Sequence, residues 1–154
     1  MRKAILSLLV VAGLAGCGGS DNSLDPNKQW MLAISSASVK ATNNGANWDV
    51  DGSPPDVFVR FTVAGVSSDS SFVQDSYTPT WNPAQGVVIT TAVLEGSGVA
   101  PVTLQFWDSD ITINDPVTDA FTLTLTEAQI NSGTVTITNF GGLDSATFKI
   151  IPQP

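Results

Sequence analysis

The chain has 154 residues, 42% of them hydrophobic, and carries a formal net charge of −8 at pH 7. This length and apolar content suit a single globular domain with a sizeable core, and they exclude a disordered chain. The sequence contains no histidine and one cysteine, Cys17. It therefore excludes an intrachain disulfide, a zinc site built from His and Cys, and nucleophiles activated by histidine.

The first residues have the features of a secretory signal. A positively charged start is followed by an apolar run from Ala4 to Leu14, which is shorter than the roughly 20 residues that span a bilayer. The segment Leu14-Ala15-Gly16-Cys17 resembles the lipobox of bacterial lipoproteins. This resemblance implies removal of residues 1–16 and attachment of lipid to Cys17. The Gly18 that follows implies an outer-membrane place in the bacterial envelope.

Cleavage would change the charge of the chain. Removal of residues 1–16 takes away Arg2 and Lys3, which leaves four basic and fourteen acidic residues and a net charge of −10. Such a surface repels nucleic acid, so we expect no nucleic-acid partner. Residues 17–28 are small, polar and proline-containing, which predicts a flexible tether between the lipid and the domain.

From Gln29 onward the hydrophobic pattern is that of strands. Apolar and polar residues alternate in several segments, and Val87–Leu94 is a continuous apolar and β-branched run. The predicted strands are Trp30–Val39, Val57–Val63, Phe72–Gln74, Val87–Leu94, Val102–Trp107, Phe121–Leu125, Thr134–Thr138 and Ala146–Ile151. Ser67–Ser71 reads as a polar turn and Glu127–Ile130 as one helical turn. The sequence therefore predicts an all-β fold, an antiparallel eight-stranded β-sandwich over residues 29–152.

Two short acidic segments adjoin these strands. Six of the fourteen acidic residues lie in them: Asp49, Asp51 and Asp56 before one strand, and Asp108, Asp110 and Asp115 after another. Crowded carboxylates repel one another, and a hard cation that takes six to eight oxygens removes that penalty. The spacing therefore favours a calcium site. The alternative is that these residues only form turns, where Asp is common.

Other chemistries for these acidic residues fit poorly. An EF-hand is a poor match because Thr112 and Ile113 stand where an acidic or amide ligand and the required Gly belong. Asp108 and Asp110 do not form a glycosidase pair, since residues so close in one loop set no acid–base separation. We therefore expect no enzymatic activity.

The ordered set of motifs resembles the C2 domain, a calcium-dependent lipid-binding sandwich. The segments that carry the resemblance are Pro55–Val59, the turn Thr78-Pro79-Thr80-Trp81-Asn82-Pro83, and the strand with its Asp pair, Leu104–Asp110. The resemblance implies calcium ligands at Asp56, Asp108 and Asp110. It implies Asp115 as the last ligand, with Asp119 as the alternative, and Asp49 or Asp51 as the first.

The resemblance also bears on topology and function. The first strand directly precedes the first acidic loop, and Ala146–Ile151 completes the sheet, which is similar to the circularly permuted strand order of that family. The function implied is a lipid-anchored calcium-binding module whose loops bind membrane lipid or a protein partner. The alternatives are a calcium-independent sugar- or peptide-binding sandwich that uses Trp48 or Trp107, and a structural envelope spacer. We expect Trp81 in the core and the other two tryptophans beside the loops.

Overall fold

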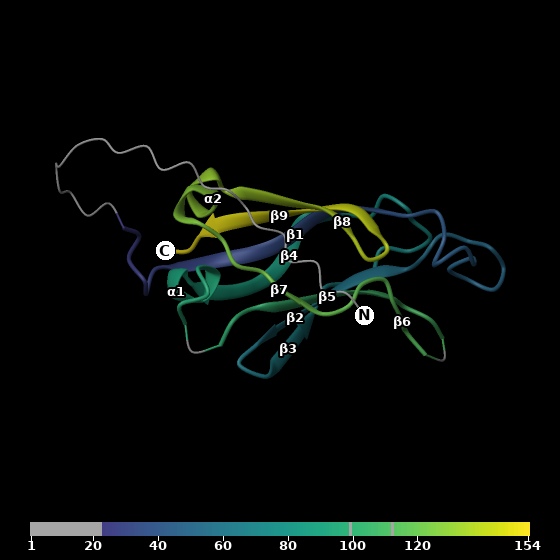
Figure 1. Cartoon of the computed structure of the whole chain (residues 1–154), viewed down its shortest axis with the longest axis horizontal. Helices are drawn as coiled ribbons and strands as arrows, with labels where there is room; N and C mark the ends of the chain where they lie inside the picture. The colour runs from purple at the N-terminus through teal and green to yellow at the C-terminus, as the bar shows by residue number, and fades with distance from the viewer. Residues whose placement is uncertain (1–22, 99, 112) are drawn as a thin grey trace, which may run out of the picture.

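The computed structural model describes residues 23–98, 100–111 and 113–154, which form two antiparallel sheets packed face to face (Figure 1). One sheet has the order β4-β1-β9-β8, and the other has the order β3-β2-β5-β6, with β7 also paired to β5. The strands of the first sheet are β1 Gln29–Val39, β4 Thr80–Thr90, β8 Thr134–Phe140 and β9 Leu143–Pro152. The strands of the second are β2 Val57–Val63, β3 Val66–Asp69, β5 Thr103–Asp108, β6 Asp115–Pro116 and β7 Phe121–Thr122. Two short helices are α1 Thr91–Leu94 and α2 Glu127–Ser132.

The predicted all-β sandwich is confirmed. Strand β2 pairs along one side of β5, so β6 and β7 both lie on its other side and together act as one interrupted strand. Counted in this way, each sheet has four strand positions. The last strand pairs with the first over Trp30↔Pro152 to Val39↔Leu143, as the permuted order requires.

The core follows from the alternation of apolar residues. Alternate residues of a strand point to the same face of the sheet. Val57, Val59 and Phe61 of β2 therefore share one face, and all three are nearly inaccessible to solvent because that face belongs to the core. Phe106 of β5 meets Phe148 of β9 between the sheets in an edge-to-face contact, with ring centroids 6.2 Å apart. Burial of each such side chain contributes roughly 1.5–3 kcal/mol, so the core rather than any loop stabilises the sandwich.

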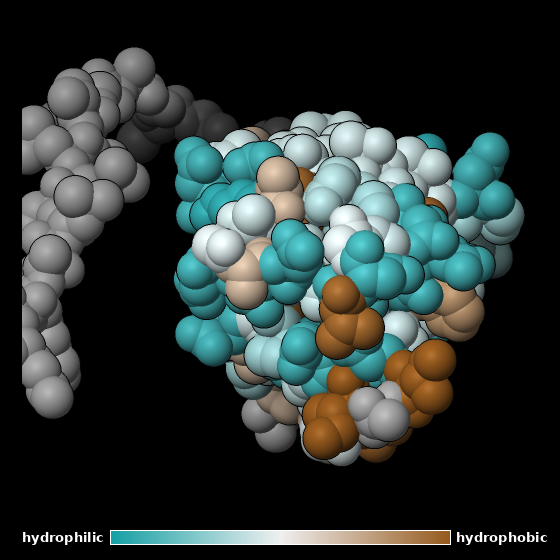
Figure 2. All heavy atoms as spheres, turned by 90° about the vertical axis from the view of Figure 1, so that its right-hand side faces the viewer, coloured by the Kyte–Doolittle hydropathy of each residue, from teal (hydrophilic) through white to brown (hydrophobic). Residues whose placement is uncertain are grey.

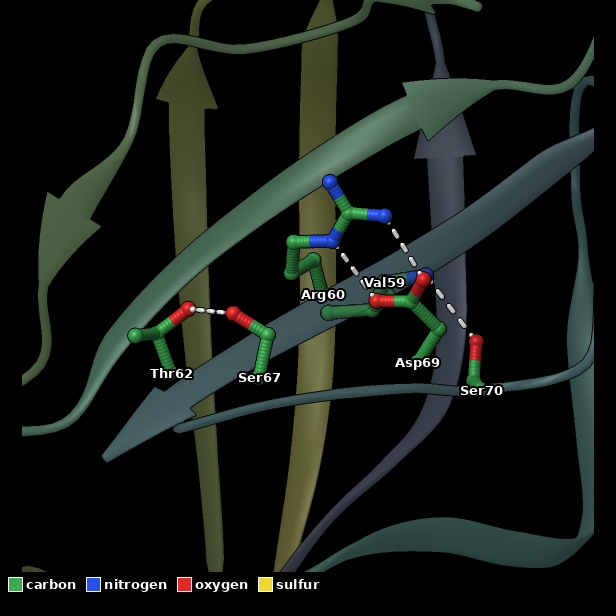
Figure 3. A network of polar contacts seen from close by, with 6 residues as sticks. All are labelled: Val59, Arg60, Thr62, Ser67, Asp69 and Ser70. Carbon is green, nitrogen blue, oxygen red and sulfur yellow. Dashed lines mark hydrogen bonds and ion pairs between the residues drawn. The ribbon is translucent and has the colours of Figure 1, made fainter. Parts of the chain in front are cut away.

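The predicted turn at Ser67–Ser71 was wrong, because β3 occupies Val66–Asp69. A tight hairpin at Ala64 and Gly65, both with positive φ, joins it to β2. Figure 3 shows the cross-strand polar contacts: Arg60 donates two hydrogen bonds to Asp69, at 2.8 and 2.7 Å. The hydroxyl groups of Thr62 and Ser67 are joined by a hydrogen bond of 2.9 Å. The strand was missed because all four of its side chains are exposed, and an exposed strand needs no apolar alternation.

Three other strand predictions differ most from the structure, and β8 and β9 also extend beyond the predicted Thr134–Thr138 and Ala146–Ile151. The strand expected at Val87–Leu94 begins at Thr80 and ends at Thr90, where the Thr90 hydroxyl accepts a hydrogen bond from Val93 N and caps α1. Phe72–Gln74 forms only an isolated bridge between Val73 and Val57. Of Phe121–Leu125, Phe121–Thr122 alone is in a strand. In the two short segments, too few residues alternate between apolar and polar for the sequence to show where a strand begins and ends.

The predicted helical turn is confirmed and slightly longer, as α2. Thr126 and Gln129 form a reciprocal capping box at its start, and Gly133 ends it in the left-handed conformation.

The described part of the predicted tether contacts the domain. Leu24 N donates to the Glu127 carboxylate at 2.9 Å, and Ala92 N donates to Pro26 O at 3.0 Å. The predicted signal segment and Cys17 lie outside the described residues. Within the part of the chain that is described, no helix has the length and apolar character needed to cross a membrane.

Candidate metal centre

The two acidic segments meet at one end of the sandwich, because β2 pairs with β5. Val57 at the start of β2 lies opposite Asp108 at the end of β5. Asp56 N donates to the Asp108 carboxylate (Oδ1) at 2.7 Å, and Ser109 N donates to Asp56 O at 2.9 Å. The sheet ladder therefore brings together residues that are far apart in the sequence.

Three carboxylates converge at this junction. Asp49, Asp108 and Asp110 each offer an oxygen, and these oxygens all lie within 4.8 Å of one another. Asp49 and Asp110 line a hollow of about 640 Å³, open to solvent, between the β1–β2 connection, the β3–β4 connection and the loop after β5, and Asp108 is buried next to them. Three oxygens at this spacing can share one hard cation.

Asp108 is the carboxylate of this group whose ionised form is unfavourable in the folded protein. It is fully buried, its Oδ1 is bonded to Asp56 N, and its Oδ2 has no hydrogen-bond partner among the described residues. Burial, together with the nearby charges of Asp49 and Asp110, raises the pKa of Asp108 to about 6, against the hydrogen bond from Asp56 N. A buried carboxylate oxygen without a partner is costly in free energy, and a bound cation would remove that cost.

Asp110 shares this environment. Burial first, and then the charges of Asp49 and Asp115, raise its pKa above the ordinary value. Its backbone N–H donates to the Asn114 side chain at 3.2 Å.

The structure distinguishes between the two candidates in the first loop. Asp49 belongs to the converging group. Asp51 is exposed at the rim, and its carboxylate accepts hydrogen bonds from the Ser53 N–H, at 3.0 Å, and from the Ser53 hydroxyl, at 2.7 Å. The Ser53 N–H is the main cause that lowers the pKa of Asp51. Asp51 is thus engaged locally, within its own turn.

The remaining predicted ligands lie around the same hollow, except one. Asp56 lines it, and Asp115, which pairs with Asp108 across β5 and β6, lines it too. Asp119 lines a different hollow of about 600 Å³, beside Lys40 and Asn43. The arrangement therefore favours Asp115 over Asp119.

Sequence reasoning missed two residues of this site, Gln74 and Asp75. Both line the hollow, and Asp75 N donates to the Asp56 carboxylate at 2.7 Å. Asp75 adopts a positive φ of 47°. A single acidic residue in the β3–β4 connection gave no clustering signal, so only the packing of the loops places it here.

The tryptophans do not form an exposed platform. Trp81 is in the core as expected. Trp48 borders the acidic loops as expected, since it lines the hollow, and it is also packed into the core, with 6% of its surface exposed. Trp107 is half-buried, and the Arg60 guanidinium lies over its ring at 5.6 Å from the centroid. The Arg60 guanidinium therefore covers one face of this half-buried indole, which is unfavourable for stacking on a sugar.

Apolar side chains surround the acidic hollow. Val50, Ile111 and Ile113 line it, and all three are exposed, at 108%, 104% and 76% of their reference surfaces. Figure 2 shows this end of the molecule, where hydrophobic residues gather beside hydrophilic ones. This end of the sandwich therefore combines acidic side chains with three exposed apolar side chains.

The fold is similar to that of several solved C2 domains. The calcium-bound pair of C2 domains from extended-synaptotagmin 2 matches with a TM-score of 0.57 and 10% identity, over 83% of this chain and 46% of that chain. The first C2 domain of plant extended synaptotagmin 1 matches with a TM-score of 0.56 and 12% identity, over 85% of this chain and 99% of that chain.

A larger protein is similar over part of its length. Human GIVD cytosolic phospholipase A2, in complex with a fluorophosphonate inhibitor and terbium chloride, matches with a TM-score of 0.53 and 16% identity, over 82% of this chain. The chain spans 17% of that phospholipase chain. No protein-family model matches the sequence. No curated protein matches it either.

The strand order, the pairing of the first strand with the last, and these likenesses in fold lead to one conclusion. The described chain is a C2-like β-sandwich domain with an acidic hollow at one end.

Proposed function

We propose that the domain binds calcium through Asp49, Asp108 and Asp110 and uses the ion to bind a phospholipid surface. The observation that carries this proposal is the buried Asp108, whose second carboxylate oxygen has no partner among the described residues although it belongs to a converging group of three acids. A structural carboxylate would be expected to have its oxygens satisfied.

The chemistry of the donors favours calcium over other ions. The described hollow offers carboxylate, amide and hydroxyl oxygens, and the chain has no histidine to attract zinc or copper. Calcium accepts six to eight oxygens in irregular geometry, whereas magnesium demands a near-octahedral set. The similar extended-synaptotagmin 2 domains are described as calcium-bound, and the similar phospholipase was solved with terbium, another hard cation.

Lipid is the partner that fits the surroundings of the ion. The chain is strongly acidic, so without a cation this end repels an anionic surface. A bound ion neutralises the carboxylates and leaves coordination positions open for a phosphate. The exposed Val50, Ile111 and Ile113 can then enter the lipid, where each buried side chain contributes roughly 1.5–3 kcal/mol. In this proposal the ion attracts the phosphate groups of the lipid, and the apolar side chains add binding free energy by entering the membrane.

The anchored arrangement is part of the same proposal. Lipid on Cys17 would hold the protein on one membrane, and residues 18–23 would link that anchor to the domain. In this arrangement calcium controls how the loop end contacts a lipid surface rather than whether the protein reaches one. Incorporation of labelled palmitate into the wild type, and its loss in Cys17→Ser, would test the anchor.

The calcium step is tested by titration calorimetry. The wild type should bind calcium, at a dissociation constant of about 10⁻⁴–10⁻³ M if it resembles extracellular modules. Asp110→Asn should weaken binding strongly, while Asp119→Asn, which changes an acid of the other hollow, should not. Absence of calcium binding in the wild type would reject the proposal.

The lipid step needs its own variant. Replacement of Val50, Ile111 and Ile113 by Ser should leave calcium binding intact and abolish co-sedimentation with phosphatidylserine vesicles in calcium. Val66→Ser/Val88→Ser is the matched control, because both residues are exposed and neither lines the hollow. Equal vesicle binding by the triple variant and the wild type would disprove the role of the apolar rim.

A further inference from the structure

Asp49 differs from the other two converging acids in how it is held. Asp108 ends β5 and is fixed by its pairing with β2 and β6. Asp110 follows directly in the loop after β5. Asp49 instead lies in the connection between β1 and β2, residues 40–56, where the described backbone forms one isolated bridge, Asn43↔Ala46. Something other than the sheet ladder must therefore hold Asp49 near its partners.

The Ser53 hydroxyl donates to Asp49 Oδ2 at 3.1 Å and Gly52 N donates to Asp49 O at 3.0 Å, but both contacts lie within the same connection. The neighbouring Trp48 ties this segment to the rest of the domain. Its side chain is 6% exposed and belongs to the hydrophobic core, although its residue lies in a loop. Its indole N–H donates to Lys40 O at 2.9 Å, which closes the first half of the connection into a ring. Trp48 also lines the acidic hollow. It thus joins the core to the segment that carries Asp49.

The six-membered ring of the Trp48 indole lies against the β8–β9 turn, which belongs to the sheet that contains β1. A Cβ placed on Gly142 would lie 2.9 Å from Trp48 Cη2 and 2.7 Å from Val117 O, so no side chain fits there. Gly142 O accepts from Lys40 N at 2.8 Å, and Gly142 N donates to Val117 O at 2.7 Å. Three segments therefore meet under the indole with no spare room.

We propose that Trp48, seated against Gly142, is a positioning residue that sets the cation affinity of the three-carboxylate site. This inference rests on the proposed function. An ion shared by three carboxylates needs Asp49 within a few ångströms of Asp108, and Trp48 limits how far the Asp49 segment moves away. Loss of a residue that orients a metal ligand typically costs about 10–100-fold in affinity. By reciprocity, a bound ion should restrict Trp48.

The test compares two tryptophan variants of the whole protein. Trp48→Phe keeps an apolar ring and removes the hydrogen bond to Lys40 O. Trp30→Phe is the matched control, because Trp30 is 4% exposed and its indole N–H donates to Thr91 at 2.9 Å, away from the hollow. Calorimetry should show calcium affinity weakened at least about 10-fold in Trp48→Phe and unchanged in Trp30→Phe.

Hydrogen exchange in chelator gives a readout that needs no metal. The Gly52 amide, which donates to Asp49 O at 3.0 Å, should exchange faster in Trp48→Phe than in the wild type or in Trp30→Phe. Gly142→Ala should act in the same direction, although it leaves the indole chemically intact. If the wild type binds no calcium, the proposed function fails, and the exchange rates alone decide whether Trp48 places Asp49.

Two results would overturn the inference. One is a Trp48→Phe protein with wild-type calcium affinity and wild-type exchange at Gly52. The other is an equal loss of affinity in Trp48→Phe and Trp30→Phe, which would mean that general destabilisation, and not the position of Asp49, lowers the affinity.

Discussion

Replacement of Asp108 by Asn should stabilise the metal-free protein and abolish its response to calcium. The Asn side chain keeps an oxygen that can accept the 2.7 Å hydrogen bond from Asp56 N, and it removes a buried charge. Its amide group can donate to oxygens of Asp49 or Asp110, which lie within 4.8 Å of the carboxylate that it replaces. The substitution therefore preserves the local packing and changes mainly the charge.

The magnitude follows from the pKa of Asp108. Its folded value of about 6 exceeds the ordinary value of 3.8, so the folded protein binds this proton more tightly than the unfolded chain does. At pH 7 the ionised carboxylate therefore destabilises the fold, by roughly 3 kcal/mol for a difference of about two pKa units. Allowing for an imperfectly bonded amide, we expect a gain of about 2 kcal/mol, or roughly 4–8 °C in melting temperature.

Calcium should narrow the stability difference between the two proteins, and it should reverse their ranking if the dissociation constant is near about 10⁻⁴ M. An ion that binds only the folded state stabilises it by about 2.7 kcal/mol when its concentration is one hundred times the dissociation constant. In 10 mM calcium the wild type should therefore gain about 1.4–2.7 kcal/mol for dissociation constants of about 10⁻³–10⁻⁴ M, and Asp108→Asn should gain almost none.

The assay is thermal unfolding at pH 7, followed by calorimetry or circular dichroism, in chelator and in 10 mM calcium. Asp119→Asn, an exposed acid outside the site, controls for the removal of one negative charge. A lower melting temperature of Asp108→Asn in chelator would refute the electrostatic reasoning. A full calcium shift in that variant would refute the site.

Three further outcomes are expected. In chelator, the melting temperature of the wild type should rise as the pH falls from 7 towards 5, because folded Asp108, with its pKa of about 6, takes up a proton that the unfolded chain does not; Asp108→Asn should show a smaller rise, because Asp110 still has a raised pKa. Calorimetry should show weaker calcium binding in Asp75→Asn, which changes an acid lining the hollow, and the retention of wild-type affinity there would remove Asp75 from the site. Denaturant unfolding should show that Phe106→Ala loses about 3–5 kcal/mol, since Phe106 is fully buried against Phe148; a loss under about 1 kcal/mol would contradict the described core.

Much of the sandwich could be predicted because its signals are local. Alternation in Val57–Val63 and in Val102–Trp107 identified two strands, and the structure pairs them. Strand β3 escaped prediction because its four side chains are all exposed, and the end of β4 escaped because the Thr90 cap and the buried Thr91 favour a helical turn there. Alternation of apolar and polar residues reveals a strand when one of its faces is buried, and it is absent when both faces are exposed.

The candidate site divides in the same way. The sequence by itself determined that each of two acidic segments adjoins an apolar strand, because alternating apolar residues favour a half-buried strand; the pairing of these two strands came from the fold. Tertiary packing decided that Asp49 rather than Asp51 joins Asp108 and Asp110, and that Asp75 from a third connection lies beside them. Loops have no repeating hydrogen-bond pattern of their own. Their positions depend on distant contacts, such as Trp48 against Gly142, that only the folded chain creates.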